Sequence, residues 1–173
     1  MSTPPGFSEW LVRAAQRDEP QALNQLLAEL SRRLGPVCGS IALDDGDDAL
    51  QETMIMIMRK LRDLEHPAAI GSWARQIAVH EAIRVSRRRQ RLTPVVADET
   101  LARFSEHLPD VGLGVDVRAT LLKLPPEHRA VLVLRHLEGL SEQETARLLG
   151  VAPGTVKSRS SRAREAFARM WAR

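Results

Sequence analysis

The sequence contains a single cysteine and no long apolar segment, and these two shortages exclude several classes of protein. Cys38 stands alone among the 173 residues, so neither an internal disulfide nor a zinc site built from cysteines can form. No run approaches the roughly 18 consecutive apolar residues of a membrane-spanning helix, and Met1–Gly6 lacks the pattern of a signal peptide. We therefore expect a cytoplasmic protein without membrane insertion, in which Cys38 is a small buried residue.

The sequence also lacks the motifs of the common catalytic sites. It has no glycine-rich phosphate loop, no metal-ligand spacing of His, Asp or Glu, and no Ser or Cys beside a plausible base. The histidines are scattered along the chain at His66, His80, His107, His128 and His136. We expect no enzymatic activity, no cofactor and no bound metal.

No segment alternates apolar and polar residues with a period of two, whereas helical spacing is frequent. One apolar stripe consists of Leu23, Leu26, Leu27, Leu30 and Leu34. A second consists of Leu50, Met54, Ile57, Met58, Leu61 and Leu64. A third helix is expected to begin at Ser72 and to reach the arginine cluster at 87–91. These patterns predict an all-α fold with the methionines of the second stripe in its core.

The formal net charge of +3 is distributed very unevenly. Residues 1–64 carry −3, residues 65–92 carry +4, residues 93–120 carry −3 and residues 121–173 carry +5. Two basic blocks separated by acidic ones are typical of two contacts with a polyanion, although basic residues also serve solubility.

A break in the helical pattern divides the chain. Residues 93–114 contain two prolines and two glycines, are mostly acidic and have poor periodicity. We interpret them as a flexible acidic linker between two small helical domains, residues 1–92 and 115–173. Because the linker lacks an apolar stripe, we expect the domains to have no fixed relation in the free protein.

The C-terminal domain contains the strongest local pattern. Pro126 can open a helix that Gly139 can end. Ser141 and Glu144 form a capping box at the start of a short helix, which stops at Gly150. A turn and an arginine-rich helix follow, so the pattern predicts a helix-turn-helix.

The second helix of this motif has two different faces. Val156, Ala163 and Phe167 share the inner face. The residues free to enter a major groove are Thr155, Ser158, Arg159 and Arg162. Arginines in that position can read guanine edges or hold phosphates. A basic helix that serves only solubility would explain the arginines but not the capping box and the glycine turn.

Residues 124–165 resemble region 4 of the extracytoplasmic-function sigma factors of bacterial RNA polymerase. The likeness is carried by Leu124-Pro125, Gly139-Leu140-Ser141, Thr155–Arg159 and Arg162-Ala163-Arg164. The resemblance implies that this domain binds the −35 promoter element. The residues it assigns to that contact are Thr155, Lys157, Ser158, Arg159, Ser161 and Arg162. Thr145 and Ser160 stand where the family usually has apolar residues, so we expect looser packing there.

The N-terminal domain carries a second resemblance to the same family. Residues Asp47–Glu52 are similar to the acidic signature of sigma region 2. On a helix, Asp48, Gln51 and Glu52 form one polar face apart from the apolar stripe. The resemblance implies that this face docks on a coiled coil in a large subunit of core RNA polymerase.

The segment Ser72–Arg89 resembles regions 2.3 and 2.4, which in the family melt and read the −10 element. The residues so assigned are Trp73, His80, Arg84, Arg87, Arg88 and Arg91. Their basic members form a stripe that can follow a phosphate backbone with salt-dependent affinity. Trp73 is either a core anchor or a stacking surface for an unpaired base. His80 and Arg84 depart from the family, in which asparagine and an acid are common.

The order of these features predicts a sigma factor that binds core RNA polymerase and promoter DNA. The alternative is a helix-turn-helix regulator that binds DNA without docking on polymerase, but residues 1–92 show no receiver-like alternation of strands and helices. A third class, an anti-sigma factor or adaptor, fits poorly with the two basic surfaces. The sequence leaves open the promoter sequence, the inducing signal and whether an anti-sigma factor binds the chain.

Overall fold

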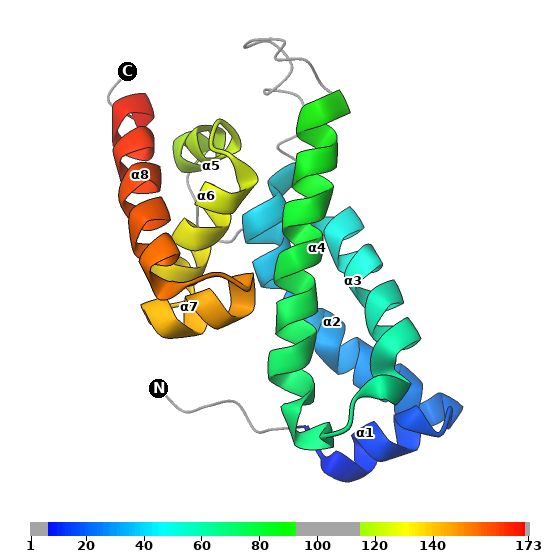
Figure 1. Ribbon diagram of the computed structural model, residues 1–173. Helices are drawn as coiled ribbons and strands as arrows, with labels where there is room; N and C mark the ends of the chain where they lie inside the picture. The colour runs from blue at the N-terminus through cyan, green and yellow to red at the C-terminus, as the bar shows by residue number, and fades with distance from the viewer. Residues whose placement is uncertain (1–6, 93–114, 172–173) are drawn as a thin grey trace.

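The computed structural model describes residues 7–92 and 115–171, and within them all regular secondary structure is helical (Figure 1). The N-terminal unit consists of α1 (Glu9–Gln16), α2 (Pro20–Ala42), η1 (Leu43–Asp45), α3 (Gly46–Lys60), η2 (Leu61–Asp63), η3 (Pro67–Ala69) and α4 (Ile70–Leu92). The C-terminal unit consists of α5 (Val115–Leu122), α6 (Pro126–Leu132), a π-helical segment η5 (Val133–Leu137), α7 (Glu142–Leu149) and α8 (Pro153–Trp171). The predicted all-α class is confirmed. The predicted linker lies outside the described residues.

The core of the N-terminal unit lies between α2, α3 and α4, with α1 packed on α2. From the predicted stripe of α2, Leu26, Leu30 and Leu34 are fully buried. Ile57 of α3 is buried as predicted, whereas Met58 is 46% exposed. The expectation that Met58 fills the core is therefore wrong, because α3 turns this position towards solvent.

The start of α3 is held very close to the end of α2. A Cβ atom added to Gly46 would lie 2.8 Å from the Cα atom of Gly39, so only glycine fits at Gly46 without moving backbone. Next to this contact Cys38 is buried, as expected, and its burial raises the pKa of the thiol to about 11. The hydroxyl of Thr53, 3.9 Å from the sulfur, offsets only part of that effect.

The helix-turn-helix of the C-terminal unit forms as its local signals predict. Ser141 and Glu144 make the reciprocal capping box, and Gly150 ends α7 with a φ of 64°. Ala146 of α7 and Val156 of α8 are buried against Val131 of α6. These contacts hold α8 across α6 and leave its other side on the surface.

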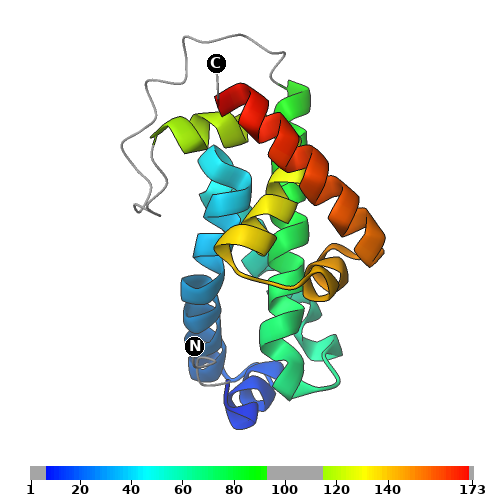
Figure 2. The same cartoon turned by 90° about the vertical axis from the view of Figure 1, so that its left-hand side faces the viewer.

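The two units pack against each other, contrary to the expectation that they have no fixed relation. Helices α6 and α7 both contact α4, and α6 also contacts α2. Figure 2 shows α6 crossing in front of α4 in the view turned by 90°. Ala130, Val133 and Leu134 of the C-terminal unit belong to the same buried cluster as the core of the N-terminal unit. The apolar stripe that makes this contact lies on α6 and η5, not in the linker.

Candidate nucleic-acid interface

The predicted recognition helix is α8, and its buried face fixes which residues point outwards. Val156 and Ala163 are completely buried. Of the six residues predicted to contact the −35 element, two are exposed, namely Lys157 and Arg162. The other four are partly buried, namely Thr155, Ser158, Arg159 and Ser161. An exposed basic helix of this kind fits the width of a major groove.

Two hydroxyls of α8 are engaged within the helix itself. Ser158 Oγ donates a hydrogen bond to the carbonyl oxygen of Thr155 at 3.1 Å, and Ser161 Oγ donates to Glu165 Oε1 at 2.9 Å. Donation from either serine to a base or phosphate would therefore require an exchange of hydrogen bonds, although each hydroxyl oxygen can still accept one. Lys157 and Arg162 need no such exchange, since no described acidic side chain forms an ion pair with them.

The two departures from the family pattern in this unit lie in different environments. Thr145 is completely buried, and its hydroxyl has no hydrogen-bond partner in the described part of the chain. Ser160, in contrast, is only partly buried. Thr145 thus contributes a buried polar atom to the helix-turn-helix at a cost of about 1–3 kcal/mol.

The residues predicted to contact the −10 element lie on α4, and five of the six are exposed. The exposed residues are His80, Arg84, Arg87, Arg88 and Arg91. Trp73 is partly buried and packs against the core of the N-terminal unit, in agreement with an anchoring role. It also lines an open cleft of about 1090 Å³ between α2, α4 and the C-terminal unit.

Two of the basic residues of α4 pair with acidic residues of two different neighbouring helices. Arg84 is turned towards α3, where it pairs with Glu52 at 3.2 Å, and it also pairs with Glu81 at 2.6 Å. The hydrogen bond from Arg84 to Glu81 raises the pKa of the guanidinium. Arg87 is turned the other way and pairs with Glu127 of α6. Within the described ranges, no carboxylate pairs with Arg88 or Arg91, which are left available for phosphates.

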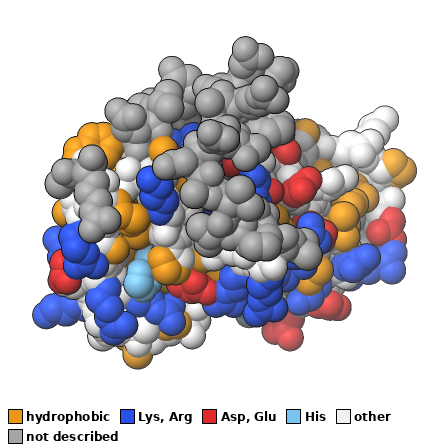
Figure 3. All heavy atoms as spheres, turned by 90° about the horizontal axis from the view of Figure 1, so that it is seen from above, with side chains coloured by type: hydrophobic (Ala, Val, Ile, Leu, Met, Phe, Trp, Pro, Cys, Tyr) orange, Lys and Arg blue, Asp and Glu red, His pale blue; other side chains and the backbone are white. Residues whose placement is uncertain are grey.

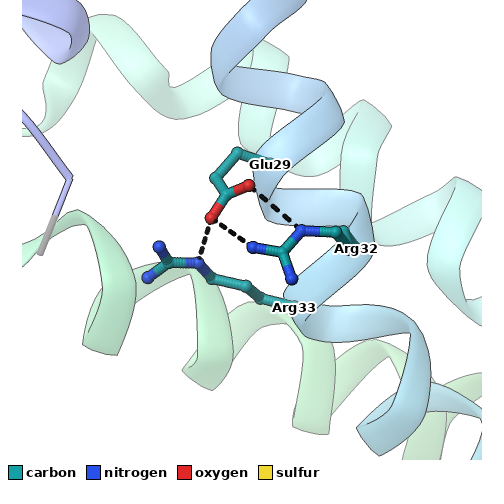
Figure 4. Close-up of polar contacts among 3 residues, drawn as sticks. All are labelled: Glu29, Arg32 and Arg33. Carbon is teal, nitrogen blue, oxygen red and sulfur yellow. Dashed lines mark hydrogen bonds and ion pairs between the residues drawn. The ribbon is translucent and has the colours of Figure 1, made fainter. Parts of the chain in front are cut away.

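Other arginines are neutralised by their own helix and add little to a nucleic-acid footprint. Glu29 of α2 accepts hydrogen bonds from Arg32 at 2.7 Å and from Arg33 at 2.6 Å (Figure 4). Both hydrogen bonds lower the pKa of Glu29, and the bond from Arg32 has the larger effect.

Figure 3 shows Lys and Arg side chains gathered along the lower edge of the view, which is the side of the molecule that faces the viewer in Figure 1. Acidic side chains lie among them.

The predicted docking face of α3 is present on the surface. Asp48 and Gln51 are exposed, and Glu52 is partly buried beside Arg84. Asp47 is exposed next to them, so the first turn of α3 is acidic. Negative charge at this end of a helix is stabilised by the helix dipole. This acidic face is separate from the basic residues at the end of α4.

Sequence reasoning missed a cluster of charges at the junction of the two units. It contains Asp44 and Asp45 of η1, Arg89 of α4, Arg118 of α5 and Arg129 of α6. Arg129 is only 2% exposed, and this burial lowers the pKa of its guanidinium to about 10. The negative charges of Asp45 and Asp44 act in the opposite direction and raise the pKa, but by less. The acidic pair of η1 is visible in the sequence, but its partners lie far away in the chain.

No group of three or more His, Cys, Asp and Glu side chains that could hold a metal ion occurs among residues 7–92 and 115–171. None of the helices described is both long enough and apolar enough to cross a membrane.

Comparisons with known proteins match two separate segments of the chain. The family model for sigma-70 region 2 matches residues 21–92, and the model for sigma-70 region 4 matches residues 115–167. The chain is 34% identical over 162 residues to the ECF RNA polymerase sigma factor SigM of Mycobacterium tuberculosis, covering 92% of this chain and 82% of that protein. It is 28% identical over 172 residues to the ECF RNA polymerase sigma-E factor of Haemophilus influenzae, covering 90% of each.

Two solved structures have a similar fold. One is CnrH in complex with the cytosolic domain of CnrY, with a TM-score of 0.61, 26% identity and coverage of 94% of this chain and 95% of that chain. The other is the sigma factor RpoE in complex with the anti-sigma factor NepR from Bartonella quintana. It has a TM-score of 0.60 at 24% identity and covers 86% of this chain and 95% of that chain, a likeness that concerns the fold.

Proposed function

The chain belongs to the extracytoplasmic-function family of RNA polymerase sigma factors, and we propose that its two helical units contact the two elements of a promoter separately. As a sigma factor it binds core RNA polymerase and directs promoter-specific initiation of transcription. The proposal concerns which of its surfaces carries each contact.

The C-terminal unit is assigned to the −35 element. The observation that carries this assignment is the helix-turn-helix itself, in which α8 is fixed by Val156 and Ala163 and presents Lys157 and Arg162 to solvent. Recognition helices of this motif read base edges from the major groove, and arginine is the commonest reader of guanine. Arg162 is therefore the best candidate for a base contact, and Lys157 for a phosphate contact.

The N-terminal unit is assigned two contacts on different helices. Asp48, Gln51 and Glu52 of α3 supply an acidic surface for core polymerase. Arg88 and Arg91 of α4 supply unpaired positive charge for the backbone of the −10 element. Because the two surfaces lie on different helices, a protein and a nucleic acid can be bound at once.

The proposal also includes the extent of the two units, the cellular location of the chain and the absence of catalytic activity. The two units extend over residues 1–92 and 115–173 with a linker at 93–114, in agreement with the residues matched by the two family models. The chain acts in the cytoplasm with polymerase, catalyses no reaction of its own and needs no cofactor. The large subunits of core polymerase supply the chemistry of RNA synthesis.

Selection of promoter DNA from a random library tests this division. Holoenzyme assembled from the chain and core polymerase should recover two separated sequence blocks. The same selection with Arg162→Ala should lose information in the upstream block alone. A single block, recovered equally well with and without core polymerase, would instead support a regulator that binds DNA independently.

A further inference from the structure

Among the large apolar side chains that the structure describes, that of Trp10 in α1 is the most exposed, at 66%. Tryptophan is a residue that proteins bury strongly on average. Trp171 of α8 is exposed as well, but its ring stacks on that of Phe167 with 5.8 Å between the ring centroids. The indole of Trp10 has no aromatic or cationic partner within the part of the chain that the structure describes.

The packing of α1 on α2 fixes this outward position of the indole. The buried residues of the helix are Leu11, Val12, Ala14 and Ala15. Trp10 and Arg13 are three positions apart, so they are neighbours on the exposed face of α1. A rotation of α1 that buried the indole would expose the four apolar side chains and lose the free energy of their burial.

Arg13 supplies a positive charge beside the indole. Arg17, one turn further along the helix, pairs with Glu19 at 2.8 Å. Arg13 forms no such pair with a described carboxylate, and this includes Glu9 on the same face of α1. Single-stranded nucleic acids are bound by aromatic rings that stack on bases together with cations that compensate the phosphates. The pair of Trp10 and Arg13, called the α1 platform below, has this composition.

The α1 platform lies beside the beginning of α4. Helix α1 contacts η3, which immediately precedes α4, and Figure 1 shows α1 at the end of the N-terminal unit where α4 begins. Phe7, three positions before Trp10, is close to Gly71, because a Cβ atom added there would lie 3.7 Å from the ring of Phe7. Phe7 and Trp73 line the same cleft. The surface that carries Trp73 on α4 therefore continues through Phe7 towards Trp10.

The two ends of α4 are directed towards different parts of a promoter. Helix α4 ends at Leu92, from which the chain continues through residues 93–114 to the unit assigned to the −35 element. This end of α4, with Arg88 and Arg91, is therefore the upstream end. The beginning of α4 and the α1 platform then lie on the downstream side of the −10 element.

We propose that the α1 platform is a third DNA contact of this sigma factor, in which Trp10 stacks on an unpaired base just downstream of the −10 element and Arg13 compensates an adjoining phosphate. The proposal rests on the assignment of α4 to the −10 element. Stacking uses the face of a base and does not read its edge, so the contact tolerates any base. A base held in this way cannot pair with the opposite strand, so the contact favours melted DNA.

The surroundings of Trp10 favour a nucleic acid over a protein as its partner. The exposed neighbours of Trp10 on α1 are Ser8, Glu9 and Arg13, which are all polar. The centre of a protein–protein interface is a contiguous patch depleted of charged residues. An isolated ring beside an unpaired cation does not form such a patch, whereas it is sufficient for one base and one phosphate.

Two single-stranded oligonucleotides bound to holoenzyme test the proposal. The first ends with the selected downstream block, and the second continues beyond it on the downstream side. Trp10→Ala should weaken binding of the longer strand about fivefold or more and leave binding of the shorter strand unchanged. Trp10→Phe keeps an aromatic ring and should retain most of the affinity. Circular dichroism verifies that each variant is folded.

Trp171→Ala is the matched control, because it also removes an exposed indole, but from α8. It should not change the difference in affinity between the two strands. Arg13→Ala should reduce the slope of log affinity against log salt by about 0.7 for the longer strand alone. An abasic nucleotide at the stacked position should remove the effect of Trp10→Ala, since the phosphate stays and only the base is lost.

Photochemical crosslinking of the wild-type holoenzyme gives a readout that needs no variant. A 5-iododeoxyuridine is placed at each position of the downstream extension in turn. Irradiation should attach one of these positions to the tryptic peptide of residues 1–13, which contains Trp10 and ends at Arg13.

The outcomes separate this proposal from the assignment on which it rests. Loss of affinity for both strands equally, or for neither, would overturn the α1 platform. Unchanged DNA binding with weakened binding to core polymerase would make Trp10 a protein contact and would overturn it as well. If Arg88→Ala with Arg91→Ala left binding of the shorter strand unchanged, the assignment of α4 would fail, whereas the crosslink to Trp10 tests the α1 platform directly.

Discussion

Arg84 of α4 lies 3.2 Å from Glu52 of α3, so a residue predicted to contact DNA is paired with a residue predicted to contact polymerase. The family commonly has an acid at the position of Arg84, and the pair shows what the arginine does instead. It joins α3 to α4 and pairs with Glu81 of its own helix. We therefore propose that Arg84 positions the docking helix and contributes less to the predicted contact with the DNA backbone.

The docking face predicts a selective loss of polymerase binding. Asp48→Ala combined with Gln51→Ala should weaken binding to core polymerase, because both side chains are exposed on the acidic face of α3. Stability should change by about 0.5 kcal/mol or less at such positions. Gln21→Ala with Asn24→Ala on exposed positions of α2 is the control. Undiminished affinity of the folded α3 variant for core polymerase, measured by fluorescence anisotropy, would reject the docking face.

The arginines of α4 predict a change in salt dependence. Arg88→Ala with Arg91→Ala should reduce the slope of log affinity against log salt by about 0.7 per lost phosphate contact on a single strand. Arg84→Ala should leave the slope nearly unchanged, since its charge is already paired. Holoenzyme binding to the downstream promoter block at several salt concentrations measures both. Equal slopes for wild type and the Arg88/Arg91 variant would show that these residues do not follow the phosphates.

The recognition helix predicts a loss confined to the upstream element. Arg162→Ala should cost about 1–3 kcal/mol of binding to a duplex with the selected −35 block if the guanidinium reads a base. Arg169→Ala, exposed further along α8, is the control and should have a smaller effect. The discriminating comparison is a duplex in which the −35 block is scrambled. A variant that lost affinity for both duplexes equally would point to a phosphate contact instead.

The buried hydroxyl of Thr145 predicts a stabilising substitution. Thr145→Val removes a polar atom that lacks a partner and keeps the volume of the side chain. The free energy of unfolding should rise by about 1 kcal/mol. Thr145→Ser keeps the hydroxyl, loses the methyl group and should be destabilised. Urea unfolding of the full chain gives both values, and a valine variant less stable than wild type would disprove the explanation.

Cys38 predicts a stability that falls in alkaline solution. Burial raises the pKa of the folded thiol to about 11, whereas a thiol in the unfolded chain ionises near about pH 8.5. Below that pH the thiol is protonated in both states, so it adds no pH dependence. Between the two values only the unfolded state ionises, so the free energy of unfolding decreases as the pH rises.

The matched comparison is Cys38→Ala, which should lack this part of the alkaline decrease because it has no thiol to ionise. The thiol should also resist alkylation at pH 8 in the folded chain and react after unfolding in urea. Rapid alkylation of the folded protein at that pH would contradict the buried position.

Local signals in the sequence predicted the longer helices of both units, but not α1, the short 3-10 helices or the π-helical segment η5. Leu26, Leu30 and Leu34 of α2 recur with the helical period and are buried. The capping box forms because Ser141 and Glu144 are only three positions apart in the sequence. Such signals act within one or two turns of the chain. They identify helices and their buried faces without reference to the rest of the molecule.

The relation between the two units could not be predicted in the same way. Asp44 and Arg118 are 74 positions apart, and neither belongs to a periodic pattern. The docking of α6 and η5 on the N-terminal core uses Ala130, Val133 and Leu134, which were predicted only as the interior of a helix. Apolar periodicity shows that a face is buried but does not show against which partner.

Reconstituted initiation tests the central claim most directly. Purified chain is mixed with core RNA polymerase lacking other sigma factors and with fragmented genomic DNA, and the start sites of the transcripts are mapped. The account predicts transcripts that require the chain and start at a fixed distance downstream of one shared pair of promoter blocks. It also predicts that Asp48→Ala with Gln51→Ala reduces them all. The same transcripts in the absence of the chain, or none in its presence, would contradict the account.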